Sequence, residues 1–393
     1  MSLLSLILAG LLTAPAFVLA STGIHLGHGV EATLFGLAIL GAAFLISWAA
    51  EVAQKDISQG MAVAILALIA VLPEYAVDMV LACKAATDPQ YGHYALANMT
   101  GANRLLVGFG WPVIVAIHML RRRKREVLLN PPHRTEIFFL GLATCYSIII
   151  PLKGYLSLID TLFFLIIFAA YAVRVVRSEV HEPELIGPAR LLGDLPAIPR
   201  RVCAVALFLF SGVAIYLSAE PFAESLVATG KGWGIDEFLL VQWLAPLASE
   251  SPEFLIAAIW TFRGDAEAGL AALLSSKVNQ WTLLVGTIAL VFSFCLGQPG
   301  ALPLDERQTH ELWLTAAQSL FAVTILVNLR LSWVEGLLLL VLFLAQLVYE
   351  DIRMEVAAAY ILLAAWMVFR YRKHYAALFR EGGLGRGSSG GMG

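Results

Sequence analysis

Two glutamates that directly follow prolines lie inside long apolar runs of the sequence. Glu74 lies in the run 58–84, and Glu253 lies in the run 236–262. An ionisable side chain at membrane depth is costly and by default indicates a functional site. A proline there leaves a backbone carbonyl without its helical donor, which is tolerated where the carbonyl is buried in protein or lines a cavity. Carboxylates beside such carbonyls predict a cation site.

Further oxygen-bearing side chains lie near each Pro-Glu pair. Asp78 lies four residues after Glu74 and so shares a helix face with it, and Glu250 lies three residues before Glu253. Either could be a cation ligand or a structural partner of another helix. Hard cations such as Ca²⁺ take about six to eight oxygen ligands from carboxylates, carbonyls and amides. The other candidate oxygens belong to Asn98, Thr100, Asn103, Ser249, Ser275, Ser276, Asn279, Gln280 and Thr282.

Two cations, Arg104 and Lys277, lie close to the middle of apolar runs. A buried cation must be paired, and the acidic residues of the two Pro-Glu runs are the expected partners. One interpretation is a static ion pair that orients helices. The other is a tethered cation that competes with the ion bound at the site.

The composition places all these residues in an integral membrane protein. The mean hydropathy is +0.79 and only 14% of residues are charged, whereas soluble domains carry roughly 25%. We expect an all-α fold of about twelve transmembrane segments of ~20 residues each. The segments are 3–20, 31–50, 58–84, 94–120, 135–152, 154–174, 201–219, 236–262, 267–296, 311–329, 331–349 and 354–371.

Lys and Arg concentrate in the loops after the even-numbered segments, which predicts cytoplasmic N and C termini. The basic run 121–125 is interpreted as a topology anchor, with binding of anionic lipid as the alternative. Segment 3–20 has the apolar character of a signal peptide but no basic residue before it, so we expect a retained helix. We expect the protein in a bacterial inner (plasma) membrane, with the lipid bilayer as its surroundings.

The Pro-Glu segments are the third and the eighth, and this odd separation makes them run in opposite directions. Such a pair predicts an inverted-topology repeat with a site near the midplane, where Glu74 and Glu253 would face each other. The predicted parts are a first half 1–175 with its repeat at about 58–120, a cytoplasmic linker 176–200, a second half 201–375 with its repeat at about 236–296, and a disordered tail 376–393.

These motifs resemble the α-repeats of the cation/Ca²⁺ exchanger superfamily (the sodium/calcium exchanger membrane region), of which the chain looks like a divergent member. That repeat reads approximately Gly-Thr-Ser-Leu-Pro-Glu, then Gly-Asn-x-x-Gly-Ser-Asn-x-x-Asn. The matching stretches are 72–74 with 97–103, and 249–253 with 275–280. The resemblance implies that Glu74 and Glu253 are the central metal ligands. It also implies that Ser249 and Ser276 are matching hydroxyls, and that Gln280 replaces the family's last amide or carboxylate.

The sequence therefore predicts a secondary-active antiporter that exchanges Ca²⁺ or a similar cation for Na⁺ or H⁺ by alternating access. One alternative is a monovalent Na⁺/H⁺-type exchanger, since the first repeat has Ala70-Val71 where the family has Thr-Ser. A second is a membrane-embedded enzyme that uses paired carboxylates as general acid and base, and a third is a binding protein that does not transport. No nucleophile–base motif, metal–histidine cluster or cofactor fingerprint occurs in the sequence. We therefore expect no enzyme activity, cofactor or nucleic-acid partner.

Overall fold

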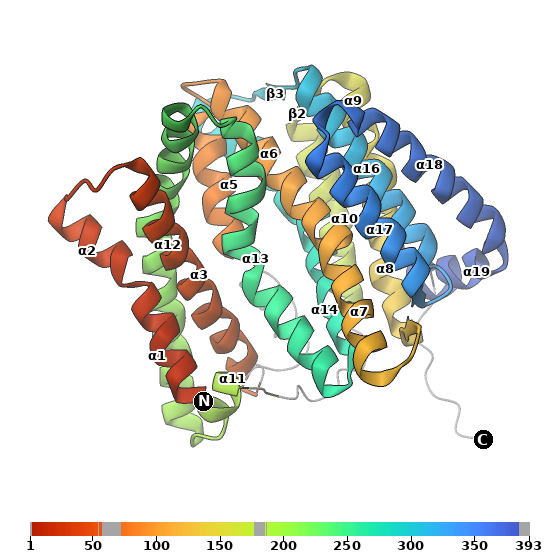
Figure 1. Ribbon diagram of the computed structural model, residues 1–393, viewed down its shortest axis with the longest axis horizontal. Coiled ribbons are helices and arrows are strands. Elements are labelled where there is room, and N and C mark those ends of the chain that lie inside the picture. The colour runs from red at the N-terminus through yellow and green to blue at the C-terminus, as the bar shows by residue number, and fades with distance from the viewer. Residues whose placement is uncertain (1, 54, 57–71, 177–184, 186, 385–393) are drawn as a thin grey trace. The chain divides into compact units, whose positions relative to one another are not determined.

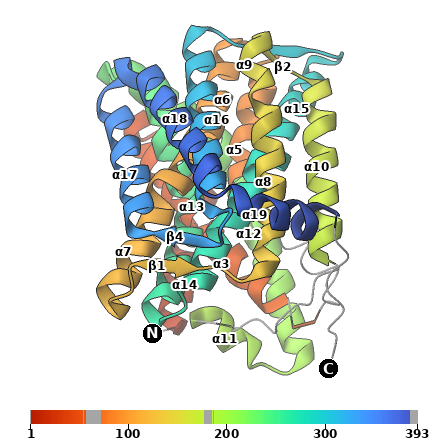
Figure 2. The ribbon, with the colours of Figure 1, turned by 90° about the vertical axis from the view of Figure 1, so that its right-hand side faces the viewer.

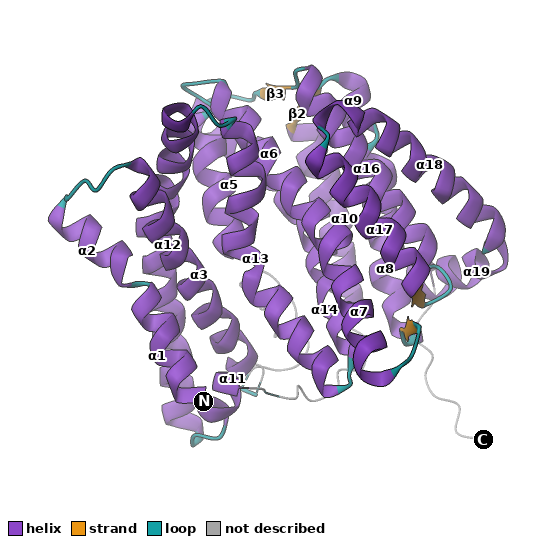
Figure 3. Cartoon of the chain, in the orientation of Figure 1, coloured by secondary structure: helices purple, strands orange, loops and turns teal. Residues whose placement is uncertain are grey.

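Figure 1 shows the computed structural model of the protein, which describes residues 2–53, 55–56, 72–176, 185 and 187–384. These residues are mostly helical, with four short strands (Figure 3). The helices are α1 (Ser2–Leu12), α2 (Ala14–Thr22), α3 (His28–Ala53), α5 (Leu72–Lys84), α6 (Gln90–Leu105), α7 (Trp111–Arg122), α8 (Arg134–Ser147), α9 (Ile149–Lys153), α10 (Leu158–Val176), α11 (Gly187–Gly193), α12 (Ala197–Trp233), α13 (Glu237–Arg263), α14 (Ala266–Asn279), α15 (Val285–Leu296), α16 (Glu306–Leu326), α17 (Trp333–Val348), α18 (Arg353–Arg370) and α19 (Arg372–Ala377).

The all-helical membrane class is confirmed. Among the described residues, eight stretches of helix are long and apolar enough to cross a membrane by length and composition. They are Ser2–Thr22, His28–Ala53, Gln90–Arg122, Pro131–Lys153, Leu158–Val176, Ala197–Trp233, Ala266–Leu296 and Glu350–Arg370. The helix α17 is apolar but shorter, and α13 and α16 fall on further predicted segments. Residues 58–71 of the third predicted segment lie outside the described residues, and the count of twelve stays a prediction.

The chain forms two compact units that do not coincide with the predicted halves. The first unit comprises residues 1–98 and 175–252, and the second comprises residues 99–174 and 253–393. Each unit therefore takes one part from each half of the sequence. The boundaries fall inside α6, α10 and α13, so these three helices contribute to both units.

The first unit is organised on α3 and α12, which lie side by side (Figure 1). Ala38 and Ala42 of α3 pack with Ala16 and Ala214 in one buried cluster. Small side chains let helix backbones approach closely in a membrane, where packing drives helix association. At Gly41 an added Cβ would lie 2.5 Å from the Ala9 carbonyl oxygen, so only glycine fits against α1. The first predicted segment is thus an integral part of this unit.

In the second unit α16 packs against α8 and α18, and α17 packs against α7 (Figure 2). Two antiparallel ribbons lie at opposite ends of these helices (Figures 1 and 2). One pairs β1 (Glu126–Leu128) with β4 (Arg330–Ser332), and the other pairs β2 (Tyr155–Ser157) with β3 (Ala301–Pro303). The β1–β4 ribbon pairs the stretch that follows the fourth predicted segment with the stretch that follows the tenth. The β2–β3 ribbon pairs the stretch that follows the fifth with the stretch that follows the ninth. Even- and odd-numbered segments here end on opposite sides, as the predicted topology requires.

The two predicted repeats have the same local order of elements. In each, an α-helix passes through a π-helical turn into a second α-helix: α6, η1 (Leu106–Gly110) and α7, then α14, η3 (Gln280–Leu284) and α15. Single π-helical turns interrupt the regular backbone ladder and occur frequently at functional sites. The likeness of the repeats thus extends from their sequence motifs to an irregular feature of their backbones.

The expected disordered tail is wrong for residues 376–384. The end of α19 and the π-helix η5 (Leu378–Leu384) form here and pack on α8 (Figure 2). Arg134 donates a hydrogen bond to the Glu381 carboxylate (Nη1–Oε2 2.6 Å), and the Phe138 and Phe379 rings meet edge to face. Glycine-rich composition predicts disorder, but packing of η5 on α8, with this ion pair and this aromatic contact, orders the segment. Residues 385–393 lie outside the described residues. The described residues also include two short 3₁₀-helices, η2 (Pro131–His133) and η4 (Glu350–Ile352). The helix α11 lies within the predicted linker.

Candidate functional site

The helix α13 carries the second Pro-Glu pair and two internal prolines, Pro246 and Pro252. Because proline has no N–H, Pro252 leaves the Ala248 carbonyl without its helical donor, and a free carbonyl is a good ligand for a hard cation. Glu250 is fully buried and Glu253 is half-buried on this helix. The sequence pattern therefore places carboxylates and a freed carbonyl within two turns of α13.

In the first unit the structure brings Asp78 of α5 and Asn98 of α6 together. The Asn98 Nδ2 donates a hydrogen bond to Asp78 Oδ1 at 2.8 Å, and both side chains are buried. Within the part of the chain that the structure describes, the other oxygens, Asp78 Oδ2 and Asn98 Oδ1, accept no hydrogen bond. Glu74, one turn before Asp78, is also buried. Asp78 and Asn98 are thus joined by one hydrogen bond, and each side chain keeps one oxygen that accepts no hydrogen bond among the described residues.

Ser249, a predicted ligand of the same unit, uses its proton locally. Its hydroxyl donates to the Ala245 carbonyl at 3.2 Å and lies 3.4 Å from the Pro246 carbonyl oxygen. Such bonds to the preceding turn are the usual way in which a buried helical serine is satisfied. The hydroxyl oxygen keeps its lone pairs and can still coordinate a cation.

The second unit holds Glu253, Ser276 and Asn279 of the predicted ligands. Glu253 Oε2, Ser276 Oγ and Asn279 Oδ1 are all buried and have no hydrogen-bond partner among the described residues. Gln280 is also fully buried, at the first position of the π-helical turn η3. Buried polar atoms in native proteins nearly always have a partner, and the exceptions call for a reason such as an ion that occupies the site.

Asn103, also predicted as a ligand, contacts Lys277 instead. Lys277 Nζ donates to the Asn103 side-chain oxygen at 2.8 Å and to its backbone carbonyl at 3.2 Å. The ammonium also lies over the Trp281 ring, 4.5 Å from its centroid, a favourable cation–π contact. The three residues are buried. The two Asn103 oxygens, which could coordinate a bound cation, therefore accept hydrogen bonds from the protein's own Lys277 ammonium group.

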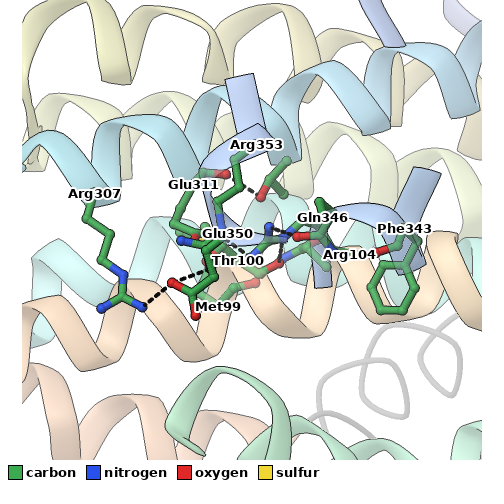
Figure 4. Close-up of polar contacts among 11 residues, drawn as sticks. Met99, Thr100, Arg104, Arg307, Glu311, Phe343, Gln346, Glu350 and Arg353 are labelled. Atoms are coloured by element: carbon green, nitrogen blue, oxygen red, sulfur yellow. Dashed lines mark hydrogen bonds and ion pairs between the residues drawn. The ribbon is translucent and has the colours of Figure 1, made fainter. Parts of the chain in front are cut away.

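Arg104 lies in an ionic cluster whose acidic residues, Glu311 and Glu350, are not among its predicted partners (Figure 4). Its guanidinium forms an ion pair with Glu311 of α16 and donates to Gln346 Oε1 of α17 at 2.8 Å. Arg353 Nη1 lies 3.1 Å from Glu311 Oε1 and its Nη2 lies 3.4 Å from Glu350. The expectation that a Pro-Glu carboxylate pairs with Arg104 is corrected here, since Glu311 fills that role.

Glu311, Gln346 and Trp281 are thus residues that sequence reasoning missed. Glu311 could have been noticed, because it is an acidic residue at the start of the apolar segment 311–329. An acidic residue at the end of an apolar segment is commonly solvated, so its position alone does not predict burial. The structure buries it instead, with only 1% of its side chain exposed.

Comparisons with known proteins agree with this architecture. A family model described as "Sodium/calcium exchanger protein" matches residues 28–177 and 203–350. The crystal structure of the H⁺/Ca²⁺ exchanger CAX is similar to this chain with 45% sequence identity and a TM-score of 0.93, over 96% of each chain. A search of curated proteins found no match.

Two more distant structures share the fold alone. The sodium–calcium exchanger NCX_Mj, soaked with Na⁺ and Sr²⁺, is 17% identical with a TM-score of 0.55, over 82% of this chain and 98% of its own. Native YfkE is 16% identical with a TM-score of 0.63, over 90% of this chain and all of its own. The two segments that the family model matches contain both Pro-Glu helices and make up most of the sequence, so the chain belongs to the sodium/calcium exchanger protein family.

Proposed function

We propose that the protein is a secondary-active antiporter that exchanges Ca²⁺ for H⁺ across the membrane by alternating access. The family to which the chain belongs consists of transporters, and its similar structure CAX is named an H⁺/Ca²⁺ exchanger. The identity of 45% over nearly the whole of both chains supports exchange of the same two ions, Ca²⁺ and H⁺, by this protein. Ca²⁺ and H⁺ are the substrates of this reaction, and the proposal includes no cofactor and no chemical catalysis.

The observation that carries the proposal is the set of buried oxygens without hydrogen-bond partners. On the Pro-Glu helices and the helices that follow them, the described residues with such an oxygen include Asp78 (Oδ2), Asn98 (Oδ1), Glu253 (Oε2), Ser276 (Oγ) and Asn279 (Oδ1). Carboxylate, amide and hydroxyl oxygens are the ligands that Ca²⁺ prefers. A membrane enzyme with paired carboxylates would explain the acids but not the accompanying amide and hydroxyl oxygens.

In the proposed mechanism Glu74 and Glu253 are the central ligands. A carboxylate oxygen that carries a proton cannot also coordinate Ca²⁺, so the two substrates compete for the same atoms. Ca²⁺ then binds only where the protons have left, and protons bind only where Ca²⁺ has left. This exclusion couples the two fluxes without any further device. Asn98 and Ser249 in the first unit, and Ser276, Asn279 and Gln280 in the second, are proposed as further oxygen ligands.

We also propose a multi-pass protein of a bacterial inner membrane with both termini in the cytoplasm. The Lys and Arg residues after the even-numbered segments support this orientation. The β1–β4 ribbon is consistent with it, because it joins loops that the same topology assigns to the cytoplasm.

The test is Ca²⁺ flux in proteoliposomes with pH and Na⁺ gradients imposed separately. We expect flux driven by the pH gradient, and we expect Glu253→Gln to abolish it while the protein still inserts and stays monodisperse. Glu237→Gln is the matched control, because it neutralises a carboxylate at the end of the same helix α13. Wild-type flux in Glu253→Gln would reject the assigned ligand. Flux that follows only the Na⁺ gradient would replace H⁺ by Na⁺ as the counter-ion.

A further inference from the structure

A basic depression of about 530 Å³ lies in the second unit, at the ends of α7 and α13. This volume is in the range of ordinary small-molecule sites. Among the described residues, its lining consists of three arginines and two apolar residues: Arg121, Arg122, Ile259, Phe262 and Arg263. None of these described lining residues carries a carboxylate. Three like charges around one concavity repel one another, and a bound anion would relieve that repulsion.

The arginines are held by specific contacts. Arg122 Nη2 donates to the Arg263 backbone carbonyl at 3.3 Å. Gly264, with a φ of 106°, makes room for the same guanidinium, because a Cβ there would lie 1.9 Å from Nη2. Arg121 lies over the Phe262 ring, 5.8 Å from its centroid. The α7 and α13 ends thus fix two guanidiniums in advance, which lowers the entropy cost of binding an anion.

The guanidinium group selects the chemical class of the anion. Its planar fork of N–H donors matches the oxygens of a phosphate and binds them in pairs. Phosphate groups reach this position either as free ions or as lipid headgroups. Both helices belong to predicted transmembrane segments, and exposed apolar side chains flank the arginines: Leu120 is 73% exposed and Phe262 is 51% exposed. These side chains suit an acyl chain and have no role toward a free ion.

We propose that this depression binds the phosphate of an anionic phospholipid, with the acyl chains along Leu120 and Phe262. Basic pockets between transmembrane helices are a known way in which membrane proteins hold anionic headgroups. The bound phosphate bridges α7, which follows the first repeat's π-helical turn, to the end of the Pro-Glu helix α13. The proposal does not depend on which ions the protein exchanges.

The test is a titration of short-chain phosphatidylglycerol into the full-length protein in a neutral detergent, followed by native mass spectrometry. Two triple variants remove equal charge from the same region. Arg121→Gln/Arg122→Gln/Arg263→Gln removes the three guanidiniums that line the depression. Arg123→Gln/Lys124→Gln/Arg125→Gln removes three charges nearby and leaves the lining residues unchanged. We expect the first to weaken phosphatidylglycerol binding roughly a hundredfold, at about fivefold per arginine. The second should bind within about twofold of the wild type.

Two further arms separate the sources of the anion. Short-chain phosphatidylcholine should bind much more weakly than phosphatidylglycerol, and inorganic phosphate should not displace the lipid at comparable concentration. Equal losses in the two triple variants, equal binding of both lipids, or full displacement by phosphate would each overturn the proposal. If the first triple variant fails to insert, the pair Arg122→Lys and Arg123→Lys keeps all charges. Only Arg122→Lys should weaken the binding of phosphatidylglycerol, because only this variant loses a guanidinium that lines the depression.

Discussion

The buried acid Glu311 offers the sharpest test of how this fold tolerates charge. It is the acidic partner of two arginines, Arg104 and Arg353, and 1% of its side chain is exposed. Replacement by glutamine keeps the volume but removes the charge. Arg104 would keep its contacts with the neutral partners Gln346 and the Thr100 carbonyl. Its guanidinium would lose the Glu311 carboxylate in the interior of the second unit.

The contacts set the expected order of effects. Breaking a buried ion pair by removing one partner costs about 3–5 kcal/mol of unfolding free energy, and we expect this for Glu311→Gln. Arg104→Gln should cost less, about 1–3 kcal/mol, because Arg353 stays 3.1 Å from Glu311 and compensates it. Glu350→Gln should cost about 0–1 kcal/mol, because its side chain is 39% exposed and solvent screens its pairs with Arg307 and Arg353.

The measurement is denaturant-driven unfolding of the purified protein in detergent, followed by tryptophan fluorescence. Glu350→Gln is the matched control, since it removes a carboxylate from the same network (Figure 4) at a side chain that is 39% exposed. The double variant Arg104→Gln/Glu311→Gln should recover part of the loss, because it removes both charges together. Equal stability of Glu311→Gln and Glu350→Gln would refute this reasoning. So would a double variant no more stable than Glu311→Gln alone.

Three other outcomes are expected. Glu74→Gln should abolish Ca²⁺ exchange in proteoliposomes without loss of insertion, because a neutral amide lacks the charge that a divalent ion needs; unchanged flux would move the site elsewhere. Lys277→Asn removes the ammonium from Asn103 and should make flux more Ca²⁺-selective and more voltage-dependent; identical flux at clamped potentials would leave Lys277 a structural partner. Hydrogen bonds from Arg200 outweigh burial and lower the pKa of Asp56 from 3.8 to about 2. Asp56 therefore stabilises the fold above its unfolded pKa and loses this effect as pH falls from about 4 to about 2. Asp56→Asn should lower the unfolding midpoint at pH 7 and progressively less below pH 4, and a constant difference down to pH 2 would contradict this.

The sequence by itself determined the all-helical membrane class and the Pro-Glu repeat. These features depend on local properties, because an apolar run of sufficient length must form a helix in lipid whatever surrounds it. Glu74 and Glu253 stand out for the same reason, since a carboxylate in such a run is costly wherever the chain later places it. Their roles as ligands follow from the family resemblance and remain a prediction.

Only the tertiary structure decided which side chains meet. Arg104 pairs with Glu311, and Lys277 with Asn103, across stretches of sequence that no spacing rule connects. A buried charge selects its partner from whatever the packed helices bring within reach, and several acids in the sequence were equally eligible. Glu381 shows the same limit, since its pairing with Arg134 orders a tail whose composition predicts disorder. Hydrophobic periodicity can be read from the sequence, whereas charge pairs between helices form only once the helices have packed.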